Sequence, residues 1–241
     1  MKLPGGDTIV SVVIPCLNEE EPIAGVISEV LAQGADEVIV VDNGSTDRTS
    51  ACARAAGARV VSEPRRGYGR ACAACVAAVR PDAGVICFLD GEGSDVPSFL
   101  AAVVGPVARN EADFVMGSRL RGRREAGSMT PQQRVAGWLA GWLMRIVYRV
   151  TFTDMSPFRA MRPAQLRALG MSEATYGWNL EMQMRAAASL RILEVPVDHR
   201  CRRGGVSKVS GNLRAGLGAA CKIAATFLRL AITLRRTPAK V

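Results

Sequence analysis

Two carboxylates separated by a single residue follow an apolar run. Asp90 and Glu92 come directly after GVICFL at residues 84–89. Mg²⁺ and Mn²⁺ bind hard oxygen ligands, commonly one or two carboxylates, and complete their coordination with water or diphosphate oxygens. The pair therefore fits a divalent ion shared with a diphosphate, although an isolated acidic pair on a turn is usually solvated surface.

Two similar polar loops follow earlier apolar runs, at residues 15–20 (PCLNEE) and 42–47 (DNGSTD). A carboxylate such as Asp42 can accept a hydrogen bond from a ribose hydroxyl or a base N–H. The same segment has the chemistry of a turn and a helix N-cap, so Ser45 and Asp47 are equally open to a structural interpretation.

The elements that must position these loops alternate along the first half of the chain. Apolar, β-branched runs typical of buried parallel strands alternate with helical patterns, which predicts right-handed crossovers and an α/β fold. We expect an open, mostly parallel sheet with helices on both faces. The predicted strands are residues 8–14, 37–42, 59–62, 84–89 and 113–117, and the predicted helices are residues 19–33, 47–56 and 69–80. Ligands of such sheets bind at the carboxyl ends of the strands, where the three loops would gather.

The second half of the chain has fewer clear elements. Thr130 as N-cap and Pro131 at the first helical position predict a helix that runs to about residue 150. Residues 192–197 predict an edge strand, because Pro196 cannot donate to a sheet ladder. Residues 212–234 have a helical pattern.

Charge is distributed unevenly along the 241 residues. Residues 1–116 carry nine basic and 16 acidic side chains, a net charge of −7, whereas residues 117–241 carry 22 basic and six acidic, a net charge of +16. Such a surface favours a polyanionic partner: nucleic acid, an anionic membrane or a phosphorylated substrate. Charge alone does not choose among the three.

Cysteine and histidine usage narrows the chemistry. Seven cysteines without regular spacing argue against a disulfide framework and predict a reducing cytoplasm. We interpret Cys72 and Cys75 as buried thiols rather than a zinc or redox pair, since no second pair accompanies them. A single histidine, His199, excludes a site with two histidine ligands. Charged residues interrupt every long apolar run, so we predict no transmembrane helix.

A set of eight motifs occurs in order along the chain. Together these motifs resemble the inverting glycosyltransferases of the GT-A fold, of the dolichyl- or polyprenyl-phosphate sugar synthase type. The resemblance covers roughly residues 8–212, and each motif is weak alone while the ordered set is specific. The motifs lie at residues 11–20, 38–47, 66–70, 88–93, 114–119, 153–161, 176–182 and 202–208.

This resemblance implies a donor site for a nucleoside-diphosphate sugar with Mg²⁺ or Mn²⁺ as cofactor. Asp90 would hold the nucleotide as a catalytic residue, and Asp90 and Glu92 together would hold the metal. Glu92 stands where the family usually has Asp, which bears on metal preference. Arg202, Arg203, Ser207 and Lys208 lie on a loop that closes over the donor diphosphate in relatives. The full set of nucleotide-sugar-binding residues is Pro15, Leu17, Asn18, Glu19, Asp42, Asn43, Gly44, Arg70, Asp90, Gly91, Arg202, Arg203 and Lys208.

On the acceptor side the resemblance implies catalytic roles for Arg119 and Arg134, which would receive the acceptor phosphate. A phosphate is already an anionic nucleophile, so it needs guanidinium groups for positioning more than it needs a general base. Asp154 and Glu181 also match family positions, either as substrate contacts or as residues that orient arginines.

The helix that starts at Pro131 has a composition typical of a membrane interface. Trp138, Trp142, Arg145 and Arg149 follow at helical spacing on one stripe. Tryptophan and arginine on a helix that does not span the bilayer favour an anionic membrane surface, while a plain core helix is the alternative. We divide the chain into a glycosyltransferase domain, residues 1–211, and an amphipathic segment, residues 212–241.

The sequence thus predicts metal-dependent, inverting transfer of a hexose, with UDP-glucose preferred over GDP-mannose, to a polyprenyl monophosphate. The enzyme would lie in the cytoplasm at the inner face of the membrane, as a possible homodimer. A soluble acceptor, either a phosphorylated small molecule or a sugar of an envelope glycan, is the alternative. A non-catalytic nucleic-acid-binding protein is a remote alternative, because aromatic residues make up only 5% of the chain and few side chains are available to stack on bases. We expect no nucleic-acid partner.

Overall fold

A computed structural model describes residues 8–204 and 225–232. Seven strands form one sheet in the order β3-β2-β1-β4-β6-β5-β7. β6 pairs antiparallel with both of its neighbours and the other pairings are parallel, so the predicted mostly parallel α/β sheet is confirmed. The strands are β1 (Val10–Cys16), β2 (Glu37–Asp42), β3 (Arg59–Ser62), β4 (Val85–Phe88), β5 (Phe114–Ser118), β6 (Arg159–Met161) and β7 (Ile192–Pro196).

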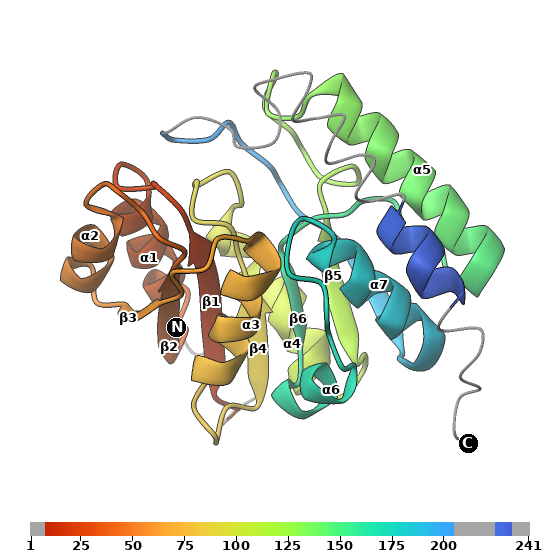
Figure 1. The fold of residues 1–241 in the computed structure, drawn as a ribbon, viewed down its shortest axis with the longest axis horizontal. Coiled ribbons are helices and arrows are strands. Elements are labelled where there is room, and N and C mark those ends of the chain that lie inside the picture. Colours follow the sequence, from red (N-terminus) through yellow and green to blue (C-terminus); the bar gives the residue numbers. More distant parts are fainter. Residues whose placement is uncertain (1–7, 205–224, 233–241) are drawn as a thin grey trace.

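Helices cover both faces of the sheet (Figure 1). Apolar side chains of one sheet face pack with α1 (Ile23–Ala32), α2 (Thr49–Ala55) and α4 (Leu100–Ala108). The other face packs with α3 (Tyr68–Ala78), α6 (Pro163–Ala168) and α7 (Trp178–Ser189), and α5 (Pro131–Tyr148) joins this second cluster beside α7. A short 3-10 turn, Pro97–Phe99, precedes α4.

The central strands are buried on both faces, which explains their continuous apolar sequence. β1 extends through Pro15 to Cys16, beyond the predicted end at residue 14. β4 pairs with β1 only as far as Val13, so the missing N–H of Pro15 removes no bond to that neighbour. β7 lies at the sheet edge as predicted, and its last residue is Pro196.

α5 starts as predicted, with a capping box. The Thr130 side chain accepts a hydrogen bond from the Gln133 N–H, and the Gln133 side chain bonds back to the Thr130 N–H. The helix ends at Tyr148, and Arg149 follows in a left-handed conformation with φ of 58°. In the described part of the chain, no helix is both long enough and apolar enough to cross a bilayer.

Five of the described elements were not predicted: the 3-10 turn at Pro97–Phe99, α4, β6, α6 and α7. Of the predicted helix at residues 212–234, residues 225–232 are helical and the rest lies outside the described residues, together with Lys208 and the proposed domain boundary at residue 211. Cys72 and Cys75 are buried free thiols, as predicted.

Candidate active site

The carboxyl ends of β1, β2, β4 and β5 form one rim, as the sequence predicted. Cys16 at the end of β1 is in register with Asp42 at the end of β2, and β4 runs beside β1 into Asp90. β5 ends at Ser118, directly before Arg119. The segment that follows β7 crosses this rim toward β1 and α1 (Figure 1).

The first and second loops hold each other by hydrogen bonds. The Asn18 N–H donates to Ser45 Oγ at 2.9 Å, and Asn18 Oδ1 accepts from the Thr46 N–H at 2.8 Å. The Glu19 N–H donates to Thr49 Oγ1 at 2.8 Å. Asn18 adopts a φ of 52°, which the side-chain bonds of an Asn help to stabilise. Residues 18–20 and 45–49 therefore form one fixed wall of the rim.

Asp42 and Asn43 are engaged within this wall. Asp42 Oδ1 accepts from the Ser45 N–H at 2.8 Å, and its other oxygen accepts from the Ser50 hydroxyl. Burial opposes ionisation, but these hydrogen bonds outweigh it and lower the pKa of Asp42. Asn43 Nδ2 donates to the carbonyls of Glu63 and Arg65. Both side chains shape the loop, and direct contact with a nucleotide stays a prediction.

Three carboxylates gather after β4. The Tyr68 hydroxyl donates to Asp90 Oδ1 at 3.1 Å, and the Asp90 N–H donates to Asp95 Oδ2 at 3.2 Å. Burial, with the charges of Asp95 and Glu92, raises the pKa of Asp90 to about 8. Burial raises the pKa of Asp95 to about 6. This concentration of negative charge is the environment that a divalent cation would neutralise.

The glycine between Asp90 and Glu92 lets the loop approach β1. A Cβ added at Gly91 would collide with Cys16 Sγ and lie 3.3 Å from Ile14 Cγ2. Any larger residue would push the two carboxylates away from the end of β1. This close approach explains why residue 91 is a glycine, while its contact with the donor stays a prediction.

Arg202 bridges two of the predicted donor residues. Its Nη1 lies 3.2 Å from Glu92 Oε2, and its Nη2 lies 3.5 Å from Glu19 Oε1. The Arg203 N–H donates to the Glu92 carbonyl at 3.0 Å, but its guanidinium pairs with Glu29 on α1. The loop thus brings Arg202 to the carboxylate pair and turns the Arg203 side chain away from it.

Arg119 is fixed by a buried carboxylate. Its Nε and Nη2 donate to the two oxygens of Asp154, each at 2.8 Å, and its N–H donates to Asp154 Oδ2 at 2.9 Å. The side chain of Asp154 is 1% exposed and that of Arg119 is 13% exposed. Burial opposes the charge of Arg119, but Asp154 more than compensates and raises its pKa, and the charges of Asp95 and Asp90 add to this. Arg119 therefore faces the acid cluster as a permanent cation.

Asp154 and Glu181 orient other groups. Asp154 holds Arg119, as described above. Glu181 is fully buried, accepts hydrogen bonds from the N–H groups of Ser172 and Glu173, and pairs with Arg185 at 2.9 Å. The structure therefore supports the interpretation of both acids as positioning residues.

No side-chain hydrogen bond or ion pair joins Arg134 or Arg70 to the acid cluster among the described residues. Arg134 lies exposed in the first turn of α5, and Arg70 lies exposed in the first turn of α3. Neither forms an ion pair with a described residue. Their roles toward acceptor and donor stay predictions.

Three buried groups at the rim were missed as site residues. Asp95 and His199 face each other through an isolated β-bridge, and Asp95 Oδ1 and His199 Nδ1 have no hydrogen-bond partner among the described residues. Burial and the charge of Arg119 lower the pKa of His199 to about 4, so its imidazole is neutral at pH 7. Arg159 is 1% exposed, lies over the Phe114 ring, and its charge acts on Tyr68 and Asp90.

The donor set fits a divalent ion that arrives with its nucleotide. Asp90 and Glu92 supply hard oxygen ligands, and burial, followed by the charges of Asp95 and Glu92, raises the pKa of Asp90, so a cation at this place would favour its ionised form. Among the described residues no three His, Cys, Asp or Glu side chains converge to hold an ion unaided. Oxygens of a diphosphate or water would therefore complete the coordination.

Comparison with known proteins places these features in a family. Residues 11–169 match the profile described as Glycosyl transferase family 2. An uncharacterized glycosyltransferase of Mycobacterium tuberculosis is 39% identical over 215 residues, covering 88% of this chain and 94% of the relative. A dolichyl-phosphate hexose transferase of Haloferax volcanii is 33% identical over 202 residues, covering 80% of this chain and 84% of the relative.

A solved structure is similar over nearly the whole chain. Glucosyl-3-phosphoglycerate synthase of Mycobacterium tuberculosis, in complex with Mn²⁺, UDP-glucose and phosphoglyceric acid, matches with a TM-score of 0.70 and 25% identity. The match covers 93% of this chain and 80% of that structure.

Proposed function

This chain belongs to glycosyl transferase family 2, and we propose that it transfers a hexose from a nucleoside-diphosphate sugar to an acceptor that carries a phosphate group. UDP-glucose is the first-choice donor and Mn²⁺ or Mg²⁺ the cofactor. A small phosphorylated molecule in solution is the first-choice acceptor. From the sequence alone, a polyprenyl monophosphate ranks first and a soluble acceptor second. The similarity to a synthase solved with Mn²⁺, UDP-glucose and phosphoglyceric acid supports the soluble acceptor as first choice.

The observation that carries the proposal is the fixed guanidinium of Arg119 opposite the acid cluster. Asp154 binds two of its three nitrogens and leaves Nη1 without a partner among the described residues. A guanidinium binds phosphate oxygens with directional, charge-assisted hydrogen bonds. Because Asp154 already fixes its rotamer, Arg119 would hold an acceptor phosphate without further loss of side-chain freedom.

On the donor side, the bound metal would stabilise the charge that develops on the diphosphate as its bond to the sugar breaks. Asp90 and Glu92 would hold that metal. Glu92 must first separate from Arg202, which occupies one of its oxygens in the described structure. Once released, the Arg202 guanidinium lies beside the donor diphosphate and adds a second positive charge there.

The displacement needs no general base when the acceptor phosphate itself is the nucleophile. A phosphate oxygen attacks the anomeric carbon from the face opposite the diphosphate. The bond from that carbon to the diphosphate oxygen breaks, and the nucleoside diphosphate leaves with the electron pair, so the configuration inverts. Arg119 positions the attacking phosphate, and the wall at residues 18–20 and 45–49 positions the nucleotide.

A polyprenyl monophosphate is the second candidate acceptor. The relative named as a dolichyl-phosphate hexose transferase covers most of both chains and favours it. The same guanidinium would bind the phosphate of either acceptor, so the chemistry at Arg119 does not distinguish a soluble phosphorylated molecule from a polyprenyl monophosphate.

The test is product detection by mass spectrometry. Purified protein is incubated with Mn²⁺, UDP-glucose or GDP-mannose, and a panel of phosphorylated small molecules and polyprenyl phosphate, with EDTA as a control. A metal-dependent hexosylated product from a soluble acceptor supports the first candidate, and a polyprenyl-phosphate hexose supports the second. Phosphatase treatment of the product identifies the nucleophile. If the acceptor phosphate attacks, the product is a glycosyl phosphodiester, which a phosphomonoesterase does not hydrolyse. If a hydroxyl of the acceptor attacks, the product keeps a phosphate monoester, which the phosphatase removes.

Arg119→Gln tests the acceptor arginine, with Arg109→Gln as the matched control. Arg109 is an exposed arginine paired with Glu111 at the far end of α4. We expect Arg119→Gln to lower kcat/KM for the acceptor at least about 100-fold, as expected for loss of a charge-assisted contact of about 3 kcal/mol, while Arg109→Gln leaves it unchanged. Equal activity of the two variants would exclude Arg119 from phosphate binding.

A further inference from the structure

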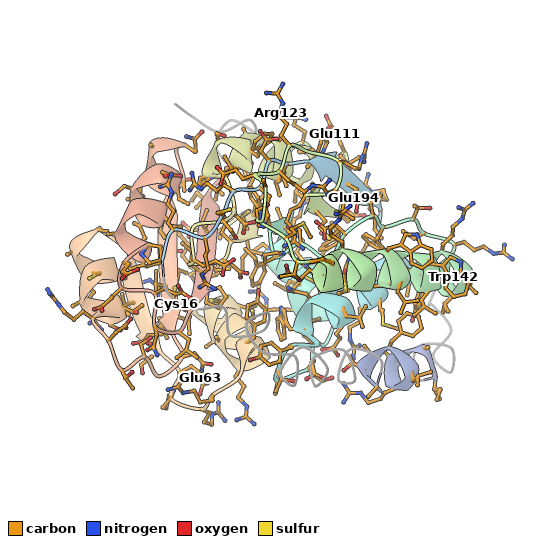
Figure 2. All side chains as sticks on the ribbon, turned by 90° about the horizontal axis from the view of Figure 1, so that it is seen from above. Cys16, Glu63, Glu111, Arg123, Trp142 and Glu194 are labelled. Atoms are coloured by element: carbon orange, nitrogen blue, oxygen red, sulfur yellow. The ribbon has the colours of Figure 1, made fainter. Side chains whose placement is uncertain are left out.

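The outward face of α5 carries a continuous apolar stripe. Trp138 is 66% exposed, Trp142 is 50% exposed and Ile146 is 57% exposed, and Leu139 lies exposed beside them. The spacing of these residues places them on one side of an α-helix. Figure 2 shows Trp142 on this helix at the margin of the molecule.

α5 packs against the rest of the protein through its opposite face, so the residues of the stripe are not part of the hydrophobic core. Ala140 and Met144 are buried, and Gly141 packs closely against the Phe152 carbonyl. A core helix buries its large apolar residues and exposes polar ones. α5 does the reverse with both of its tryptophans, which is the pattern of a binding surface.

Arginines border the stripe, and no acidic residue occurs between Pro131 and Tyr148. Arg145 and Arg149 are exposed, follow Trp138 by seven and eleven residues, and form no ion pair with a described residue. Exposed tryptophans flanked by unpaired arginines match the boundary of an anionic lipid bilayer, where the rings insert at headgroup level and the guanidinium groups meet lipid phosphates.

From these observations we propose that α5 docks the protein on an anionic lipid bilayer through Trp138, Leu139, Trp142 and Ile146. The occupant is a bilayer rather than a second copy of the chain, because two identical stripes bordered by arginines would bring like charges together. The proposal goes beyond the proposed function, since bilayer binding is independent of which phosphorylated acceptor is used.

The position of α5 links this docking face to the acceptor side of the rim. Gly137, the residue directly before Trp138, packs against Asp154: a Cβ added there would lie 3.8 Å from Asp154 Oδ1. Asp154 in turn holds Arg119. A bilayer on the outer face of α5 is therefore one helix diameter, about 10 Å, from the carboxylate that fixes the acceptor arginine.

Vesicle sedimentation of the full-length protein tests the proposal. We expect the protein to sediment with vesicles of 70% phosphatidylcholine and 30% phosphatidylglycerol, and less with phosphatidylcholine alone. Trp138→Ala/Trp142→Ala should lower the bound-to-free ratio more than about tenfold, since each interfacial tryptophan contributes apolar burial. Arg145→Gln/Arg149→Gln should remove most of the preference for anionic vesicles and weaken its salt dependence.

Leu31→Ala, an exposed apolar residue on α1, and Arg109→Gln serve as matched controls. Both should bind vesicles like the unaltered protein. Equal sedimentation of the tryptophan variant and the controls would overturn the proposal, as would the absence of binding to anionic vesicles. A dimer in light scattering that the tryptophan variant dissociates would assign the face to a second copy instead. Thermal unfolding confirms that the variants fold, and turnover of a soluble acceptor separates failure of docking from failure of the proposed function.

Discussion

Replacing Asp154 with Asn would remove the counter-charge of a buried arginine while keeping the shape of the side chain. Arg119 donates three hydrogen bonds to Asp154, and the two side chains are 13% and 1% exposed. Removing one partner of a buried ion pair leaves an uncompensated charge and costs about 3–5 kcal/mol. That is a large fraction of the about 5–15 kcal/mol by which a folded protein is stable.

Urea unfolding at pH 7 measures this change. With an m-value of about 3 kcal/mol/M, the midpoint should fall by about 1–2 M. Asp82→Asn is the control, because Asp82 pairs with Arg80 at 2.6 Å on the surface, where solvent screens the charges and the pair contributes little to stability. A loss of less than about 1 kcal/mol in Asp154→Asn would refute the interpretation of the pair as a buried support.

The pH dependence gives an independent check. Burial opposes ionisation of Asp154, but Arg119 outweighs it and lowers the pKa of Asp154 below its ordinary value near 3.8. The stabilisation is therefore complete above about pH 4 and is lost as the pH falls through the lower, folded-state pKa. The difference between the unaltered protein and Asp154→Asn should shrink as the pH is lowered from 5 toward 3. A difference that grows on acidification would contradict the assignment.

A double variant separates structural support from acceptor binding. Arg119→Met/Asp154→Leu replaces the ion pair with apolar side chains of similar size, which commonly restores stability. We expect its unfolding free energy to exceed that of Asp154→Asn, while its kcat/KM for the acceptor stays as low as that of Arg119→Gln. Recovery of activity together with stability would show that the arginine does not contact the acceptor.

Two further predictions concern the donor side. Asp90→Asn should abolish Mn²⁺-dependent transfer and yet stabilise the metal-free protein. Burial and the charges of Asp95 and Glu92 raise the pKa of Asp90 to about 8, so the unaltered protein loses stability as the pH rises from about 4 to 8. Urea unfolding in EDTA should therefore show a larger gain in unfolding free energy for the variant at pH 8 than at pH 5. Arg202→Gln should raise the affinity of the nucleotide-free protein for Mn²⁺ by up to about fivefold, as expected for a partly exposed pair, because it frees one oxygen of Glu92 while the Ser94 hydroxyl still donates to the other. Electron paramagnetic resonance of free Mn²⁺ measures this affinity, and an unchanged value would contradict competition at that carboxylate.

Local sequence patterns predicted the strands that consist of a short run of β-branched residues. β2 and β3 match their predicted bounds, because apolar β-branched runs between turn residues leave little room for another structure. β6 was missed because only three residues form it, and one of them is an arginine. The burial of Arg159 depends on carbonyls at residues 156 and 179 that fold over it, which no local pattern reveals.

Site residues could be predicted where a single motif contains both the reactive side chains and the strand end that positions them. Asp90 and Glu92 follow a strand, so the end of that strand places them. Asp95 and His199 are 104 positions apart in the chain and meet only because the segment after β7 crosses the rim. The role of Asp154 was undecided for the same reason, since its partner Arg119 lies 35 residues away and is brought to it by the fold.

The sheet order has a consequence for how new specificities can arise. Strands β1 to β4, which carry the donor loops, are continuous in sequence through residue 95, whereas β5, β6, α5 and Arg119 come later in the chain. The two parts meet in the sheet only where β6 pairs with β4, over three residues. Recombination near Pro97 would therefore break one short strand pairing within the sheet, but it would also replace the segment after β7 that brings Arg202 to Glu19 and Glu92. Because the two parts of the chain share the nucleotide-sugar site, acceptor choice can change by such an exchange only when the incoming part supplies an equivalent crossing segment.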